Sequence, residues 1–205
     1  MDYTTLPPRA TVEKVVANLK DRNIEATIVE TKEEALAKIK EWIPKGASVM
    51  NGASTTLQEI GFVDYLKAGT HGWNNLHAAI VTETDPAKQA ELRKQSVLSD
   101  YYLGSVHALA ESGELVIASN SGSQLPHIVY TSPNVIFVVS TQKITPTLAD
   151  AQKRLMEHVI PLEDKRMMSV YGSGTHLSKE LIFHSENPFF GRKIRVLFVN
   201  EKLGF

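Results

Sequence analysis

Hydrophobic residues along this chain repeat at two spacings, one typical of helices and one typical of strands. Residues 11–22 place valine and leucine three and four positions apart, which predicts an amphipathic helix. Residues 24–28 alternate apolar and polar side chains, as a strand with one solvent-facing side does. A second helical pattern follows Thr31, which is predicted to form a capping box with Glu34. Helix, strand and helix in this order indicate an α/β fold.

The alternation continues through the next part of the chain. Residues 47–50 form a short apolar run before a glycine turn, which is typical of a buried parallel strand. Residues 55–68 predict a helix interrupted at Gly61, and residues 71–75 are expected to form a loop. A further helix is expected to begin at Pro86, because proline suits the first turn of a helix.

Strand patterns dominate the second half of the chain. They are expected at residues 101–110, 115–118, 134–140 and 193–200. A helix is predicted to begin at Thr147 and to end at Pro161, because proline cannot donate the helical hydrogen bond. The pattern predicts an α/β fold with a mainly parallel sheet flanked by helices. Composition changes nowhere along residues 1–205, so we expect one domain, with residues 1–22 as a candidate helical appendage.

The composition excludes several classes of protein. With 42% hydrophobic residues, 22% charged residues and a formal net charge of −1, the chain is expected to bind no nucleic acid. No apolar stretch is long enough to span a membrane and residues 1–8 lack a secretory signal, so we expect a cytoplasmic protein. The absence of cysteine removes disulfides and thiolate-held clusters from this chain. The seven histidines show no ligand spacing, and no metal site is predicted.

Small and polar residues follow the second predicted strand at positions 51–56. Backbone N–H groups at a strand-to-helix turn attract anions, and small side chains let a ligand approach them. This predicts binding of a small anionic carboxylate or phosphate by Asn51, Gly52, Ser54 and Thr55. The alternative is that the segment only caps a helix.

Glu111 lies in a tight turn between two apolar strands. A partly desolvated glutamate at a strand end can act as an acid, a base or a carboxylate nucleophile. Glu111 is therefore the candidate catalytic residue. The alternative is a hairpin with solvated acids, since its neighbours are ordinary turn residues.

Three further polar segments are candidates for the same binding site. Asn120 and Ser121 follow one predicted strand, and Lys143 follows another. Ligands of α/β proteins bind beyond the carboxyl ends of the strands, so these residues are expected to bind substrate, with Lys143 supplying positive charge. Ser173 belongs to a glycine-rich loop that lacks the Walker ending, which disfavours ATP hydrolysis. The alternative for each segment is a solvated surface loop.

Four segments resemble the LUD-domain family of lactate utilization proteins, and the resemblance extends from about Val12 to Val199. The segments are NGASTTLQEIGF, SVHALAESGELV, NVIFVVSTQKITPTLADAQKR and KIRVLFVN. The resemblance implies a fold similar to sugar-phosphate isomerases, CoA-transferases and 5-formyltetrahydrofolate cyclo-ligases. It further implies a role in oxidation of lactate or a related hydroxy acid, beside partner subunits that carry iron-sulfur clusters. This cysteine-free chain resembles the cluster-free component, and no cofactor is predicted in it.

Two features of the resemblance leave alternatives open. Many family members carry an acidic residue in a Ser-x-Thr-x-Asp-Ile run, and residues 173–178 lack it. The turn around Glu111 resembles the nucleophilic turn of CoA-transferases, so a CoA-transferase-like or sugar-phosphate isomerase-like enzyme is the alternative. Catalysis by the isolated chain and assembly into a homo-oligomer are further alternatives.

Overall fold

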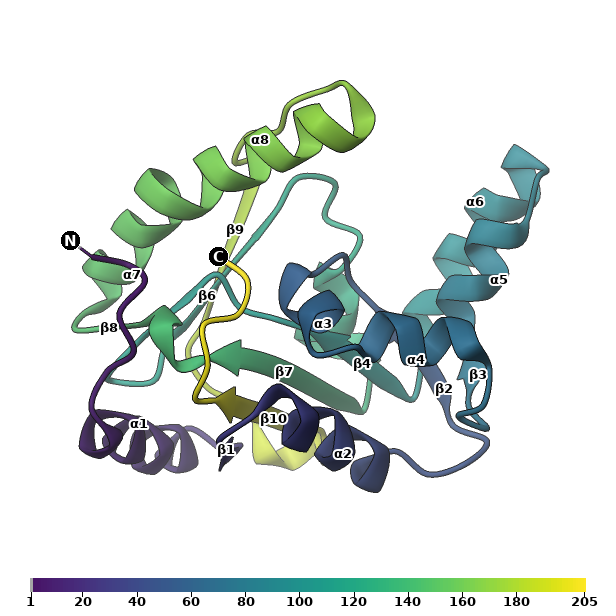
Figure 1. The fold of residues 1–205 in the computed structure, drawn as a ribbon. Helices are drawn as coiled ribbons and strands as arrows, with labels where there is room; N and C mark the ends of the chain where they lie inside the picture. Colours follow the sequence, from purple (N-terminus) through teal and green to yellow (C-terminus); the bar gives the residue numbers. More distant parts are fainter. Residues whose placement is uncertain (1) are drawn as a thin grey trace.

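A six-stranded sheet forms the centre of the computed structural model, which describes residues 2–205 (Figure 1). Its strand order is β1-β10-β7-β4-β2-β3, and each neighbouring pair is parallel. The strands are β1 (Ile24–Val29), β2 (Ser48–Asn51), β3 (Asn74–Asn75), β4 (Tyr101–Gly104), β7 (Asn134–Ser140) and β10 (Lys193–Val199). The predicted α/β fold with a mainly parallel sheet flanked by helices is confirmed.

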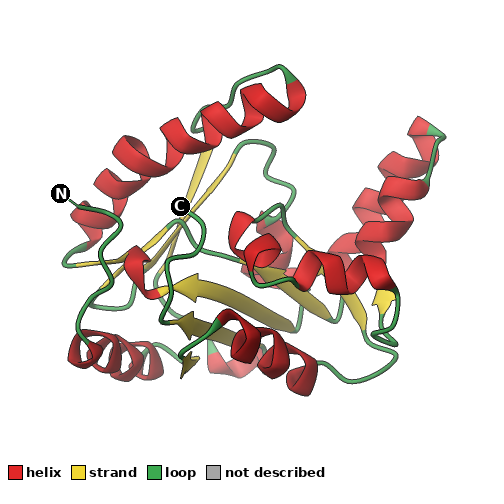
Figure 2. Ribbon diagram, viewed as in Figure 1, coloured by secondary structure: helices red, strands yellow, loops and turns green. Residues whose placement is uncertain are grey.

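Both faces of this sheet are covered, as the helices drawn in red in Figure 2 show. The helices are α1 (Arg9–Asp21), α2 (Lys32–Trp42), α3 (Thr55–Glu59), α4 (Phe62–Ala68), α5 (Leu76–Thr82), α6 (Pro86–Gln95), α7 (Leu148–Arg154) and α8 (Ile160–Tyr171). Successive side chains of a strand point to opposite faces, so Phe137 of β7 packs beside α1 whereas Val138 packs beside α2, α3 and α4. A strand buried on both faces has a continuous apolar sequence.

Helix α1 is packed into this core. Val12, Val15 and Leu19 have almost no exposed surface and belong to the same cluster as the β7 and β10 side chains on that face. Within the candidate appendage of residues 1–22, residues 9–21 cover one side of the sheet. The helical spacing of the three side chains is the reason that they all reach it.

The strands of a second sheet were the least well predicted from the sequence. This sheet has the order β8-β5-β6-β9, and its strands are β5 (Ala108–Ala110), β6 (Leu115–Ser119), β8 (Ile144–Thr145) and β9 (Lys179–Phe183). The predicted strand 101–110 is wrong as a single element, because β4 pairs in the parallel sheet and β5 in the second sheet. The chain leaves the first sheet after Gly104, where a Cβ would lie 3.2 Å from the ring of Tyr102.

The helix that starts after Thr147 continues through Pro161, which corrects the prediction that it ends there. A π-helical turn (Leu155–Val159) joins α7 to α8, and the three segments form the long helix at the top of Figure 1. Proline lacks an N–H and clashes with the carbonyl one turn earlier in a regular α-helix, and a wider turn at this point changes that spacing. The continuation carries charged side chains of α8 towards the sheet ends.

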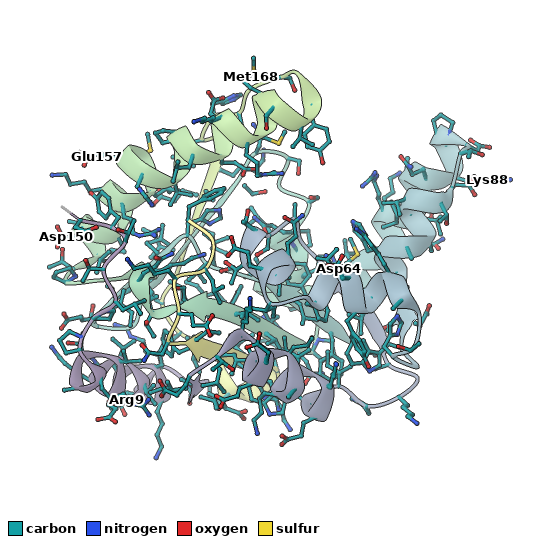
Figure 3. The ribbon with its side chains drawn as sticks, in the orientation of Figure 1. Arg9, Asp64, Lys88, Asp150, Glu157 and Met168 are labelled. Atoms are coloured by element: carbon teal, nitrogen blue, oxygen red, sulfur yellow. The ribbon has the colours of Figure 1, made fainter. Side chains whose placement is uncertain are left out.

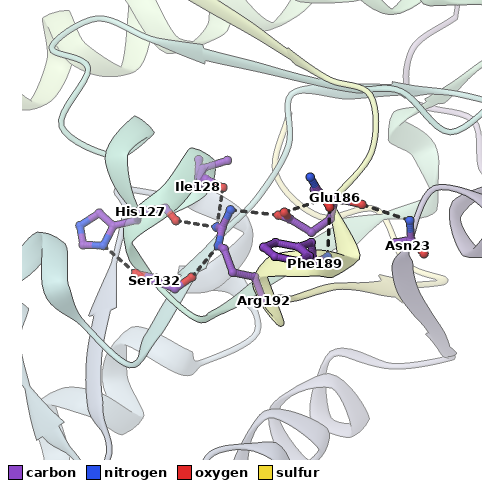
Figure 4. A network of polar contacts seen from close by, with 8 residues as sticks. Asn23, His127, Ile128, Ser132, Glu186, Phe189 and Arg192 are labelled. Atoms are coloured by element: carbon purple, nitrogen blue, oxygen red, sulfur yellow. Dashed lines mark hydrogen bonds and ion pairs between the residues drawn. The ribbon is translucent and has the colours of Figure 1, made fainter.

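A buried ion pair fixes the chain just before β10, on the side of the sheet that α1 covers (Figure 4). Arg192 Nη1 lies 2.9 Å from Glu186 Oε2, and the two side chains are 7% and 8% exposed. The same guanidinium donates to the carbonyl oxygens of Ile128 and Ser132 at 2.8 and 3.1 Å. Arg192 therefore ties residues 186–192 to the segment that precedes β7.

Charged side chains lie mostly at the periphery. Arg9, Lys88 and Glu157 project outwards from three different helical segments (Figure 3). In the described part of the chain, residues 2–205, no helix has both the length and the apolar character of a membrane span.

Candidate functional site

A pocket of about 240 Å³ lies where the carboxyl ends of strands from both sheets meet. Its lining comes from the segments that follow β2, β4, β6 and β7, together with the start of α8 and residues 204–205. The carboxyl ends of parallel strands in an α/β sheet are the usual place for a ligand. The topology therefore collects polar loop residues from distant parts of the sequence around one space.

Lys143 is the buried cation of this pocket. It follows β7 in a short 3₁₀ turn (Thr141–Lys143), and the residue is 3% exposed. Nζ donates to the hydroxyl oxygens of Thr56 and Ser105, both at 3.1 Å, and to the carbonyl oxygen of Val106 at 3.2 Å. All three acceptors are uncharged. Within residues 2–205 no carboxylate forms an ion pair with this ammonium group.

The surroundings of Lys143 lower the affinity of its amine for a proton. Burial and, to a smaller extent, the positive charge of Arg154 lower the pKa of Lys143 to about 7, with Glu59 acting in the opposite direction. Arg154 is itself buried and donates to the carbonyl oxygen of His107, and its Nε has no hydrogen-bond partner among residues 2–205. Within the described chain, two cations without carboxylate partners thus lie in one region of the protein interior.

The segment after β2 forms one wall of the pocket. Gly52, Ser54 and Thr55, for which the sequence predicts anion binding, line this pocket, and Ser54 also caps α3 by accepting the N–H of Leu57 at 3.3 Å. The capping and binding interpretations are therefore compatible in the same segment. A Cβ on Gly52 would collide with the Tyr102 hydroxyl group, so only glycine permits this approach.

Asn120 and Ser121 line the opposite wall, after β6. Asn120 Nδ2 donates to Thr175 Oγ1 at 3.2 Å and so joins this wall to the segment after α8. Two other predicted residues lie outside the lining. Asn51 is buried, and its Oδ1 has no hydrogen-bond partner in the part of the chain that the structure describes. Ser173 is exposed in the loop after α8.

Glu111 does not share the pocket with Ser54 and Lys143. Its carboxylate pairs with Lys14 of α1 at 2.9 Å, and its carbonyl oxygen accepts from Asn18 of the same helix at 2.7 Å. Because β5 and β6 are antiparallel, the turn that joins them lies at the end of these strands away from the carboxyl end of β6. The surroundings of Glu111 are those of a surface ion pair.

Several lining residues were not singled out from the sequence. His107 is half-buried, and its Nδ1 accepts the N–H of Ala118 at 3.0 Å. Desolvation, together with the positive charges of Lys143 and Arg154, lowers the pKa of His107 to about 3, so the ring is neutral. On α8, Glu163 and Arg166 form a two-point ion pair at 2.6 and 2.7 Å. Lys143 can be identified from the sequence as a candidate site residue because it directly follows a predicted strand. Arg166 cannot, because its helix is expected from the sequence to end at Pro161.

The segment after β10 closes one side of the pocket against Lys143. Gln142 Nε2 donates to the carbonyl oxygens of Leu203 and Gly204 at 3.2 and 3.0 Å, and Glu59 accepts the N–H of Gly204 at 2.6 Å. Gly204 has φ +60°, and a Cβ there would collide with Thr56 Oγ1 and lie 3.2 Å from Lys143 Nζ. This segment therefore holds its position only with glycine at 204.

Gly204→Ala is expected to destabilise the protein by about 1–3 kcal/mol beyond the cost of the left-handed backbone, because the new Cβ overpacks the pocket wall. The control is Gly69→Ala, at φ +70° with nothing within 4 Å of the added Cβ, which should cost only about 1–2 kcal/mol for the conformation. Urea unfolding of both variants measures the difference. Equal losses would show that residues 203–205 do not pack as described.

Comparison with known proteins identifies a family and a similar fold. The family model described as the LUD domain matches residues 12–179. In fold, the chain is similar to the crystal structure of a DUF162 family protein from Deinococcus radiodurans, with a TM-score of 0.55 and 12% sequence identity, over 96% of this chain and 100% of that chain. At this identity the likeness concerns the fold. No curated protein matches the chain.

Proposed function

The chain belongs to the LUD-domain family, and from this premise we propose that it is a lactate-utilization-type protein whose pocket binds a small 2-hydroxy or 2-oxo carboxylate. The observation that carries the proposal is Lys143, a buried cation at the pocket wall whose hydrogen-bond acceptors are all uncharged. Buried charges in proteins are normally paired, because desolvation of an isolated charge is costly. An anionic ligand supplies the missing partner.

The rest of the lining suits the polar groups of such an acid. Ser54, Thr55 and Asn120 bring hydroxyl and amide groups, which can bind a carboxylate oxygen or the hydroxyl group at carbon 2. Arg166 is already paired with Glu163, so the pair adds no net charge across the pocket. We therefore assign the carboxylate to Lys143.

Oxidation of a hydroxy acid also requires an electron acceptor. The chain has no cysteine with which to hold an iron-sulfur cluster, so the proposal assigns electron transfer to partner subunits of that kind. In this arrangement the chain binds the acid and the partner takes the electrons. Lactate-driven reduction of a dye should need the partner subunits, and reduction by the chain alone would contradict this division.

Affinity for lactate is expected to fall above about pH 7, the pKa of Lys143 in the protein. A carboxylate binds the ammonium form, so proton loss from Lys143 weakens binding by up to about tenfold per pH unit until the pKa of the complex is reached. Thermal-shift titrations from about pH 6 to about pH 9 measure this, since bound ligand raises the melting temperature.

Lactamide is the matched control, because it has the shape of lactate without the charge. It should bind weakly at every pH. Pyruvate and glycolate should behave as lactate does, whereas a preference for sugar phosphates would favour the isomerase-like alternative. Lactate binding that does not change across this range would mean that Lys143 is not its counter-charge.

A further inference from the structure

Lys143 places a primary amine, rather than a guanidinium group, against the pocket. A primary amine can form a covalent imine with a carbonyl compound when it is desolvated or lies near another cation. The Nζ atom lies 3.1 Å from each of two hydroxyl oxygens, those of Thr56 and Ser105. Hydroxyl groups both donate and accept, so they can pass a proton to and from a reacting nitrogen.

The charged groups around this nitrogen favour the free amine. Arg154 adds positive charge from the direction of α7, and neutral His107 adds none. Glu59 of α3 is the opposing group, but its carboxylate accepts the N–H of Gly204 rather than a proton of Lys143. Since burial lowers the pKa of Lys143 from its usual value to about 7, the free amine is present near neutral pH.

We propose that Lys143 forms a reversible imine with the keto carbon of a 2-oxo acid in this pocket. The class of acid rests on the proposed function, because a 2-oxo acid is the product of oxidising a 2-hydroxy acid. The reactivity of the nitrogen rests on its burial, its two hydroxyl neighbours and the absence of a paired carboxylate within residues 2–205.

The step balances without an oxidant or a reductant. The lone pair of Nζ forms a bond to the keto carbon, and the carbonyl electron pair moves to oxygen, which takes a proton from the Ser105 or Thr56 hydroxyl group. That hydroxyl group recovers a proton from Nζ, which leaves a carbinolamine. The carbinolamine loses its hydroxyl group and the remaining proton on nitrogen as water, and a C=N bond forms. One amine and one 2-oxo acid give one imine and one water.

This reaction would distinguish the product of oxidation from its substrate. Lactate has no carbonyl group at carbon 2 and can bind Lys143 only through its charge. Pyruvate can bind through its carboxylate and then react. The site would therefore retain a 2-oxo acid more firmly than the corresponding hydroxy acid.

The test is reductive trapping of the full chain with pyruvate as the probe. Sodium cyanoborohydride reduces an imine to a stable secondary amine, so intact mass should show one added carboxyethyl group and peptide mapping should place it on Lys143. Lys153, an exposed lysine on α7, is the internal reference. Modification at Lys143 should exceed that at Lys153 by at least about tenfold, because an ordinary lysine is almost wholly protonated near pH 7. Lactate should leave no adduct.

Mapping of the unmodified sequence needs no variant and so does not depend on whether a variant folds. Lys143→Arg should abolish the adduct and Lys153→Arg should leave it unchanged. Equal labelling of Lys143 and Lys153, or no label on Lys143, overturns the imine. If lactate and pyruvate still bind in a Lys143-dependent manner, that result leaves the proposed function standing. An adduct on Lys143 without lactate binding supports the imine and overturns the hydroxy-acid assignment.

Discussion

Arg192→Ala is expected to lower the free energy of unfolding by about 3–5 kcal/mol, the usual cost of breaking a buried ion pair from one side. The substitution leaves Glu186 buried without its cation, since that carboxylate is 2.9 Å from Arg192 and its side chain is 8% exposed. It also removes the donor from the carbonyl oxygens of Ile128 and Ser132. Urea unfolding followed by circular dichroism measures the loss.

The control is Arg9→Ala. Arg9 pairs with Glu13 and Glu30, but its side chain is 52% exposed, so solvent screens these pairs and their loss should change the free energy of unfolding little. For a chain of this size, the Arg192 variant should melt roughly 6–20 °C lower. If both variants lose the same small amount, the network in Figure 4 does not stabilise the fold as its geometry indicates.

Lys143→Met is expected to weaken lactate binding by about 10- to 150-fold, which corresponds to the loss of about 1.5–3 kcal/mol for a hydrogen bond to a charged group. Methionine keeps much of the volume and apolar contact of the lysine stem while removing the ammonium group that faces Thr56 and Ser105. Isothermal titration calorimetry at about pH 6, where Lys143 is protonated, gives the largest difference.

The same variant should remain folded. Burial lowers the pKa of Lys143, so the charged form is less favourable in the folded protein than in the unfolded chain, and an apolar side chain removes that cost. We expect a free energy of unfolding equal to that of the original sequence or higher. Lys153→Met, at a lysine that is 54% exposed, should change neither binding nor stability. Lactate binding that survives Lys143→Met would remove this residue from the site.

The strands of the parallel sheet were largely predictable, because a buried strand can be recognised from its own run of apolar residues. Residues 134–140 form β7 with the predicted bounds, since a strand covered on both faces must be apolar throughout. Residues 101–110 are also mostly apolar, yet they divide between two sheets. A run of apolar residues indicates that a segment is buried. It does not indicate which other strand the segment pairs with.

The helix through Pro161 was mispredicted for a related reason. A proline usually ends a helix, but the π-helical turn before it accommodates the ring. Packing of Leu155 and Val159 against β5 and β6 residues holds that turn in place, and this contact is not visible in a local pattern. The charged pair on α8 was missed as a consequence.

The candidate site was predictable where a residue directly follows a parallel strand. Lys143 and Ser54 follow β7 and β2, and parallel strands bring their carboxyl ends together whatever lies between them in the sequence. Glu111 joins two antiparallel strands, whose ends point in opposite directions, so the same rule does not place it. His107 was not recognised as a site residue, because it lies within a segment that was expected to be a strand.

The most direct test is a crystal structure of the protein with bound lactate, because the account depends on which charge the carboxylate meets. We predict one carboxylate oxygen about 2.7–2.9 Å from Lys143 Nζ, with the ligand lying between the segment after β2 and the segment after β6. Lactate bound elsewhere on the molecule, or in this pocket with its carboxylate directed away from Lys143, would contradict the account.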